Sequence, residues 1–238
     1  MSTLPWLDPD YLWFPPPEEA LRDPDGLLAA GGDLAPERLV LAYRSGIFPW
    51  YGDNQPILWW SPDPRCVIIP GQEHISRSLR RTINQQRFRI TIDQAFGDVI
   101  RRCGSARPEG TWIIPEMIEA YETLHQQGLA HSFEAWNSDG ELVGGLYGVA
   151  LGRCFFGESM FSRETNASKV VFVAICQQLA RWGYRLMDCQ VENDHLLTLG
   201  AHTIPRTEFL SILQENVDQS PDQSGWHIDS PWPSSGEV

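Results

Sequence analysis

The pattern of hydrophobic residues changes at Gly128, and this change most restricts the fold. Between residues 73 and 127 the apolar residues recur with the period of a helix, and after Gly128 the period changes and the segments are typical of strands. Three antiparallel strands are predicted, the first two joined by a turn at 138–140, and a long helix then leads to a fourth strand. This order is typical of an α+β fold. The predicted strands cover 131–136, 142–151, 153–161 and 185–191, and the helix covers 166–182.

The segments before Gly128 divide the chain further. Up to about residue 70 the sequence is dense in Pro, Gly and Trp, which predicts turns and short elements. One helix is expected there, beginning at Pro36 and ended by Gly46. Further helices are predicted over 73–83, 93–103 and 115–127, and after Pro205. We expect a small N-terminal domain over 1–70, a larger domain over 71–212 with an arginine-rich helical part, and a flexible acidic tail over 213–238.

One segment concentrates positive charge. The chain has 18 Lys and Arg against 31 Asp and Glu, and its net charge of −13 argues at first against a nucleic-acid partner. Between Arg77 and Arg102, however, seven arginines and two aspartates give a net charge of +5. Guanidinium groups fork onto phosphate oxygens, so this segment is suited to an RNA backbone. On charge alone, a solvated helix face is an equally good interpretation.

Neither a membrane span nor a metal site is expected. No apolar run approaches the roughly 20 residues that cross a bilayer, and the N-terminus lacks the features of a signal peptide, so we expect a soluble cytoplasmic protein. The five cysteines are odd in number and scattered, which predicts reduced thiols. No histidine stands at a ligand spacing from a cysteine or a second histidine, so no metal is predicted.

Two short runs place polar residues beside apolar ones on predicted strands, as active sites do. The first is Gly-Glu-Ser-Met-Phe-Ser over 157–162, and the second is Asp-Cys-Gln over 188–190. Side chains two apart on a strand leave on the same face, so Asp188 and Gln190 are expected to converge. Their neighbours Met187, Cys189 and Val191 are expected to face the other way. A carboxylate that touches an amide indicates proton chemistry.

With these residues in view, the sequence resembles the leucyl/phenylalanyl-tRNA–protein transferases, from Phe14 to about Leu210. A chance match over so many separate runs is implausible. The matching runs are 25–28 with 31–34, 46–50, 57–65, 110–112, 157–162 with 166–169, 188–190 and 199–201.

The resemblance implies an enzyme that transfers Leu or Phe, and less readily Met, from aminoacyl-tRNA to the α-amino group of a protein whose first residue is Arg or Lys. The product would carry a destabilising N-terminus that bacterial proteolysis recognises, as in N-end rule degradation. The resemblance also implies a C-terminal domain similar to the N-acetyltransferase (GNAT) fold and a separate, smaller N-terminal domain. It implies no cofactor, no metal and no membrane partner, and we expect a monomer.

The resemblance also assigns catalytic residues. Asp188 would polarise the amide of Gln190, whose carbonyl oxygen meets the attacking amine, and Glu158 would meet the positive acceptor terminus. Because a neutral amide is a feeble base, we expect Asp188 to take the proton directly or through water. Taken singly, these carboxylates would be interpreted as turn or edge residues, but the two motifs together favour function.

Binding residues follow from the same resemblance. The donor side chain needs a dry pocket, although its predicted residues would otherwise be interpreted as core. Trp50 and Trp112 match aromatic residues that flank the terminal adenosine, on which a base can stack. The arginine-rich segment falls where contact with the tRNA backbone would lie. The predicted pocket residues are Leu146, Phe155, Met160, Ser162, Ile175 and Leu179, and the predicted tRNA contacts are Arg77, Arg80, Arg81, Arg87 and Arg89.

Two other functions fit parts of the sequence. An acyl-CoA N-acetyltransferase would share the C-terminal architecture, but such enzymes hold pyrophosphate on a glycine-bearing turn that opens a helix. The helix entry here, 162–166, has no glycine. The other alternative is a non-catalytic adaptor that binds tRNA or N-terminal peptides. An adaptor has no transfer activity, so Asp188→Ala could not reduce it.

Overall fold

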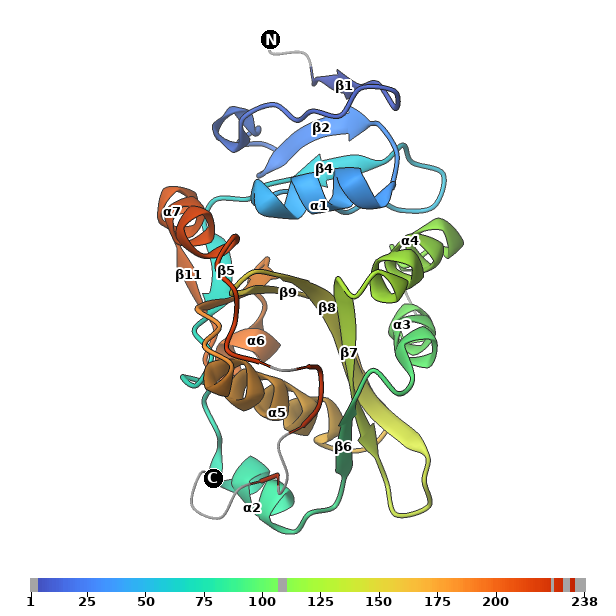
Figure 1. Cartoon of the computed structure of the whole chain (residues 1–238), viewed down its shortest axis with the longest axis vertical. Coiled ribbons are helices and arrows are strands. Elements are labelled where there is room, and N and C mark those ends of the chain that lie inside the picture. The colour runs from blue at the N-terminus through green and yellow to red at the C-terminus, as the bar shows by residue number, and fades with distance from the viewer. Residues whose placement is uncertain (1–3, 107–110, 224, 229–231, 234–238) are drawn as a thin grey trace.

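The computed structural model describes residues 4–106, 111–223, 225–228 and 232–233. Figure 1 shows a small sheet with helix α1 (Pro36–Arg44) at one end of the molecule and a larger sheet with the other helices below it. The small sheet has the order β1-β2-β4-β3. Its strands are β1 (Trp6–Leu7), β2 (Leu27–Gly31), β3 (Phe48–Pro49) and β4 (Leu58–Trp60), and a short 3₁₀ helix covers Pro17–Glu19.

The larger sheet contains seven strands in the order β11-β5-β10-β9-β8-β7-β6. Its strands β7, β8 and β9 form an antiparallel meander, whereas β9 and β10 are parallel and are joined through helix α5. Parallel neighbours need such a crossover connection. The strands are β5 (Arg65–Ile68), β6 (Arg89–Ile92), β7 (Ala130–Trp136), β8 (Leu142–Leu151), β9 (Cys154–Ser162), β10 (Leu186–Gln190) and β11 (His202–Ile204).

Helices cover both faces of the larger sheet. Figure 1 shows α5 (Ala167–Arg181) on one face and α3 (Phe96–Ser105) with α4 (Pro115–Gln126) on the other. Helix α5 is buried along most of its length, because its sequence is apolar almost all round. The remaining helices are α2 (Arg77–Asn84), α6 (Asp194–Thr198) and α7 (Arg206–Asn216).

Local signals explain where the helices begin and end. Proline occupies the first turn of α1 and α4, where its missing N–H costs nothing. The Ser76 hydroxyl accepts a hydrogen bond from the backbone N–H of Leu79 and so caps α2. Gly128 and Gly183 follow α4 and α5 with φ values of 73° and 75°, a left-handed conformation that glycine adopts without strain.

The α+β class, with a smaller N-terminal unit and a larger C-terminal sheet unit, is confirmed, as are the predicted strands and the helices of 36–46, 115–127, 166–182 and the segment after Pro205. Two helices begin later than predicted: α2 at Arg77, after its Ser76 cap, and α3 at Phe96. Asp93 cannot open α3, because its φ is 57° and its carboxylate accepts a hydrogen bond from the Ser132 backbone.

Two features depart from the predicted divisions of the chain. Strand β5 pairs with β10 and β11, so the chain enters the larger sheet by Arg65, ahead of the predicted boundary at residue 70. The tail was expected to be flexible, yet Trp226 stacks on His131 at 3.5 Å between ring centroids and packs against Trp182. Aromatic packing therefore holds this part of the tail against α5 and the sheet.

Within the described ranges, no helix is long and apolar enough to cross a membrane. The five cysteines are free thiols and all are buried.

Candidate active site

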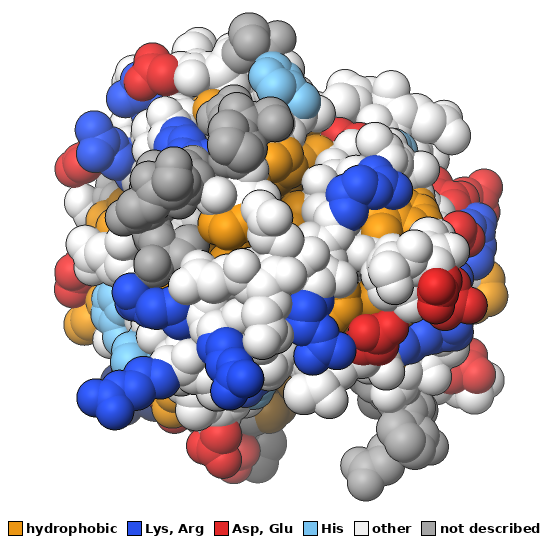
Figure 2. All heavy atoms as spheres, turned by 90° about the horizontal axis from the view of Figure 1, so that it is seen from below, with side chains coloured by type: hydrophobic (Ala, Val, Ile, Leu, Met, Phe, Trp, Pro, Cys, Tyr) orange, Lys and Arg blue, Asp and Glu red, His pale blue; other side chains and the backbone are white. Residues whose placement is uncertain are grey.

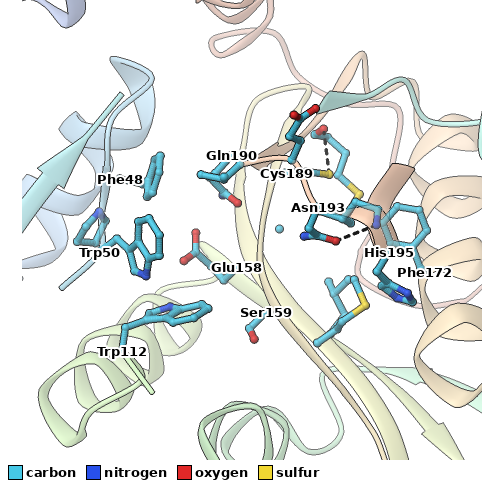
Figure 3. Close-up of a pocket in the computed structure, with 18 residues that line it drawn as sticks. Phe48, Trp50, Trp112, Glu158, Ser159, Phe172, Cys189, Gln190, Asn193 and His195 are labelled. Atoms are coloured by element: carbon cyan, nitrogen blue, oxygen red, sulfur yellow. Dashed lines mark hydrogen bonds between the residues drawn. The ribbon is translucent and has the colours of Figure 1, made fainter. Parts of the chain in front are cut away.

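A cavity of about 430 Å³ opens where the small sheet faces strands β9 and β10. Its walls come from β3 and the residue after it, from Trp112, from β8, β9 and β10, and from α5 and the segment leading into α6. Figure 3 shows Glu158 and Gln190 in this cavity, opposite Phe48 and Trp50. The two residues named by the sequence runs therefore share one compartment.

Two tyrosines hold Glu158 in place. Tyr43 of α1 donates a hydrogen bond to its Oε1 at 2.6 Å, and Tyr121 of α4 donates to its Oε2 at 3.1 Å. The two hydroxyls also contact each other. Burial raises the pKa of Glu158 to about 7, although the two tyrosine hydrogen bonds act in the opposite direction. At neutral pH this carboxyl group is poised to gain or lose a proton.

Asp188 lies behind the cavity wall and is completely buried. Its two oxygens accept hydrogen bonds from Nε and Nη2 of Arg65, at 2.8 and 2.7 Å. Arg65 is equally buried, donates to the carbonyl of Gly46 and lies over the rings of Phe48 and Phe209. This bidentate ion pair fixes Asp188 on the side away from the cavity.

Gln190 leaves β10 in a different direction from Asp188, so the prediction that their side chains share a face is wrong. The register shifts between the two residues, and Gln190 has a φ of 57°. Such a bulge breaks the strand alternation. The backbone N–H of Gln190 donates to Asp188 Oδ1 at 3.0 Å, while its side chain lines the cavity with Met187 and Cys189.

The side-chain nitrogen of Gln190 is a buried donor with no hydrogen-bond partner. A buried polar group without a partner costs about 1–3 kcal/mol. The bulge and the Asp188–Arg65 pair together hold the Gln190 side chain in the cavity wall.

The cavity floor is apolar and only partly as predicted. Leu146 and Met160 line it, but Phe155, Ile175 and Leu179 are fully buried and do not. Ser162 lies outside it, at the turn before α5, where its hydroxyl donates to the carbonyl of Glu164 and accepts from the Ser168 N–H. The floor residues that the sequence did not single out are Phe172, Met187, Cys189 and Leu196.

Trp50 and Trp112 meet at the mouth of the cavity. Their ring centroids are 6.0 Å apart at an interplanar angle of 80°, and Trp60 lies 5.6 Å from Trp50. Trp60 Nε1 donates to the Trp50 carbonyl, which ties the Trp60 indole to the Trp50 backbone. The edge-to-face pair leaves flat surfaces suitable for stacking a base.

The five predicted tRNA arginines lie away from this cavity. All are exposed, on α2, on β6 and in the turn between them. Helix α2 is at the lower end of Figure 1, and Figure 2 shows Lys and Arg side chains spread over that lower face. This face lies away from the cavity, and its exposed arginines are suited to contact with phosphate groups.

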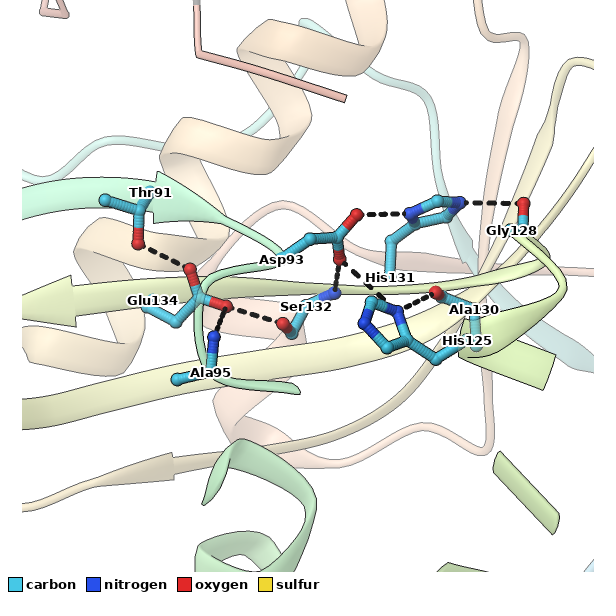
Figure 4. A network of polar contacts seen from close by, with 9 residues as sticks. All are labelled: Thr91, Asp93, Ala95, His125, Gly128, Ala130, His131, Ser132 and Glu134. Atoms are coloured by element: carbon cyan, nitrogen blue, oxygen red, sulfur yellow. Dashed lines mark hydrogen bonds and ion pairs between the residues drawn. The ribbon is translucent and has the colours of Figure 1, made fainter. Parts of the chain in front are cut away.

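Among the described residues, one group of side chains is close enough to hold a metal ion: Asp93, His125 and His131. Figure 4 shows that their atoms already have partners. His131 lies between Asp93 Oδ2, at 2.7 Å, and the Gly128 carbonyl, and His125 Nδ1 contacts the Ala130 carbonyl. Hydrogen bonding therefore accounts for this group, which ties the segment before α3 to β7.

Comparison with known proteins adds independent information. The family model described as leucyl/phenylalanyl-tRNA protein transferase matches residues 67–214, and the model of its N-terminal domain matches residues 32–63. Proteins named leucyl/phenylalanyl-tRNA–protein transferase are similar over most of the chain. The one from Hahella chejuensis is 58% identical (91% of this chain, 93% of the relative), and the one from Pseudomonas fluorescens is 55% identical (94% and 99%).

The protein of that name from Anaeromyxobacter sp. is 57% identical and covers 93% of this chain and 94% of the relative. L-PGS from Bacillus licheniformis superposes with a TM-score of 0.39 at 13% identity, over 67% of this chain and 52% of that one. A superposition this weak assigns neither fold family nor function.

Proposed function

Because this chain belongs to the leucyl/phenylalanyl-tRNA–protein transferase family, we propose that it transfers Leu or Phe, and less readily Met, to proteins that begin with Arg or Lys. The donor is the aminoacyl-tRNA ester, and the acceptor is the α-amino group. The product is a substrate for N-end rule degradation. The observation that carries the proposal is the single cavity that holds Glu158 and Gln190 beside an apolar floor.

The reaction is the aminolysis of an ester. The amine nitrogen attacks the ester carbonyl carbon, a C–N bond forms, the ester C–O bond breaks, and the ribose oxygen leaves as a hydroxyl with the proton that the amine gives up. An α-amine has a pKa of about 8 and so is partly neutral at pH 7. Orientation of the reactants and one proton acceptor supply most of the acceleration.

Glu158 is the proton acceptor that the geometry supports best. Its carboxyl group faces the cavity, and burial raises its pKa to about 7, close to the pKa of the α-amine that must lose a proton. Asp188, the proton acceptor expected from the sequence, does not line the cavity and is fully buried in an ion pair with Arg65. Asp188 instead acts as a positioning residue, since it accepts the backbone N–H of Gln190.

Gln190 then serves as a donor. Attack on the ester places negative charge on the carbonyl oxygen, and a preorganised N–H stabilises that charge. The unpartnered side-chain nitrogen of Gln190 is suited to this role. The role also avoids asking a neutral amide to act as a base.

The aminoacyl-adenosine end of the donor tRNA occupies two parts of the cavity. Its side chain fits the floor around Leu146, Met160 and Phe172, and the terminal adenosine stacks at Trp50 and Trp112. An apolar floor separates substrates that differ by one methylene by about 1–3 kcal/mol, so preference rather than exclusion is expected. Exposed arginines of α2 and β6 contact the tRNA backbone without reading its sequence.

One assay tests the activity. Labelled Leu-tRNA and Phe-tRNA are presented with peptides that differ only in a first residue of Arg, Lys or Ala. Transfer to the Arg and Lys peptides, and not to the Ala peptide, is expected. Absence of transfer from either tRNA, or equal transfer to all three peptides, would contradict the proposal.

A second assay tests the tRNA surface. Arg80→Glu/Arg81→Glu should raise the KM for aminoacyl-tRNA at low salt, because phosphate contacts are lost, and should leave a small aminoacyl-adenosine donor unaffected. Equal effects on both donors would move the backbone contact elsewhere.

A further inference from the structure

A second cavity adjoins the first and shares Trp50 and Trp112 with it. Its volume is about 880 Å³, and it lies between the small sheet and the segment that leads into α4. Leu27, Leu58 and Ile113 contribute apolar surface to its walls. The cavity is within the size range of about 300–1,000 Å³ that is usual for ligand sites.

The charges around this cavity are acidic. Asp53 is exposed in its wall, and Glu116 follows the lining residue Pro115 at the start of α4. No Lys, Arg or His is among the described residues that line it. Carboxylates without a neighbouring cation disfavour phosphate and favour a neutral or cationic ligand.

The wall is also organised in advance. The backbone N–H of Trp50 donates to the Leu58 carbonyl, and Trp60 Nε1 donates to the Trp50 carbonyl. Tyr51 is only 4% exposed, and its hydroxyl has no hydrogen-bond partner. Burial, with a contribution from the Glu116 charge, raises the pKa of Tyr51 to about 12. The hydroxyl therefore stays protonated and is available as a donor.

We propose that this second cavity binds the acceptor polypeptide just after its first residue, with a preference for basic over acidic side chains. The inference rests on the function proposed above. With the α-amine at Glu158, the acceptor chain leaves past Trp50 and Trp112 into the second cavity. A peptide carbonyl accepts from Tyr51, and cationic side chains lie near Asp53 and Glu116.

A nucleotide of the tRNA 3′ end is the competing occupant. It would also stack on tryptophan, but its phosphate would lie beside Asp53 and Glu116. The exposed arginines that would neutralise RNA are on α2 and β6, at the other end of the molecule. The charge distribution therefore favours the peptide.

Three acceptors with the same first residue test the proposal: arginine amide, Arg-Lys-Lys and Arg-Asp-Asp. The wild type should transfer to Arg-Lys-Lys with a higher kcat/KM than to Arg-Asp-Asp. Asp53→Asn/Glu116→Gln should reduce that ratio about two- to fivefold, the range expected for exposed charges. The kcat/KM for arginine amide should stay unchanged, because it has no residue to place in the second cavity.

Tyr51→Phe examines the hydrogen bond separately. It should raise the KM of both tripeptides by about two- to tenfold and leave arginine amide unaffected. The matched control for Asp53→Asn/Glu116→Gln is Glu119→Gln/Asp139→Asn, which removes the same charge from exposed positions that do not line the cavity. Thermal unfolding of each variant separates a folding defect from a binding defect.

The outcomes are distinct. A variant effect on the KM for aminoacyl-tRNA, with no change in acceptor preference, would assign the cavity to RNA and overturn the proposal. Equal use of both tripeptides by the wild type would also overturn it. Absence of transfer even to arginine amide would instead remove the proposed function on which this subsite depends.

Discussion

Two polar networks in this protein differ in whether their donors are satisfied. Both contain buried carboxyl groups whose pKa burial raises, Glu158 in one and Glu134 in the other. The catalytic network consists of Tyr43, Arg65, Tyr121, Glu158, Asp188 and Gln190, of which Figure 3 shows Glu158 and Gln190. The β7 network consists of Thr91, Asp93, His125, His131, Ser132 and Glu134 (Figure 4).

The β7 network is closed. Glu134 accepts hydrogen bonds from Thr91, from Ser132 and from the Ala95 backbone, and none of its described neighbours in the network has a buried unpartnered atom. The catalytic network is open, because Gln190 presents an unpartnered donor and Glu158 faces a cavity. A raised pKa occurs in both, so it does not identify the active site by itself. An unpartnered hydrogen-bond donor beside a cavity identifies it.

Glu158→Gln should produce the largest effect. It keeps the shape of the side chain but removes the proton acceptor, so the single-turnover transfer rate should fall by about 10²–10⁴-fold. The Leu-tRNA Kd should change little. A rate within a few-fold of the wild type would show that Glu158 does not accept the proton, and water in the cavity would then be the remaining acceptor.

The same variant has a signature in stability. The pKa of Glu158 is raised from 4.5 to about 7, so the folded state keeps a proton that the unfolded state loses. The associated stability is fully present below pH 4.5 and is lost as pH rises through about 7. Urea unfolding of Glu158→Gln should therefore show a smaller loss of stability between pH 4.5 and 7 than that of the wild type.

Arg65→Met tests the buried ion pair between Arg65 and Asp188 in the catalytic network. It leaves the buried Asp188 charge without a partner, which should lower the free energy of unfolding by about 3–5 kcal/mol. Arg65→Met/Asp188→Leu removes both charges and should regain much of the stability measured by urea unfolding. The double variant should still transfer slowly, because the Gln190 backbone has lost its acceptor. Recovery of full activity would show that Asp188 has no positioning role.

Much of the fold could be predicted because long elements carry their own signals. The turn at 138–140 follows from its Ser-Asp-Gly sequence and strand β8 from its run of apolar residues and glycines, and α5 is bounded by Asn166 and Gly183. The short strands β1 to β6 and β11 were not predicted, since strands this short rarely show a period. Their pairing is set by the partner strand rather than by their own sequence.

The site was predictable residue by residue but not in its geometry. The motifs led to Glu158, Gln190 and Trp50, yet Tyr43 and Tyr121 reach Glu158 from helices 115 and 37 residues away in sequence. Arg65 lies 123 residues before Asp188. The bulge at Gln190 also had no sequence signal, because its positive φ occurs at a residue other than glycine.

Glu134→Gln is the matched substitution in the β7 network. Ser132 and the Ala95 N–H can still donate to the new amide oxygen, but Thr91 loses its carboxylate acceptor. We expect the free energy of unfolding to change by about 1–3 kcal/mol while kcat for transfer stays unchanged. Chemical denaturation and single-turnover kinetics measure the two. A loss of kcat as large as that of Glu158→Gln would remove the distinction between the two networks.

Tyr43→Phe should produce the smallest effect, and it tests how the catalytic network sets the pKa of Glu158. The hydrogen bond from Tyr43 stabilises the ionised carboxylate, so its loss should raise that pKa further above about 7. Since the base must be ionised, the rise of kcat/KM with pH should move to higher pH by up to about one unit, equivalent to a hydrogen bond of about 1 kcal/mol. Tyr43→Phe retains the ring contact with Phe156, which limits the change in packing. The α-amine of the acceptor also titrates in this range, so the profiles are compared with two acceptors whose amines differ in pKa. A shift that follows the acceptor and not the Tyr43 substitution would assign the observed pKa to the amine and leave Glu158 without a catalytic titration.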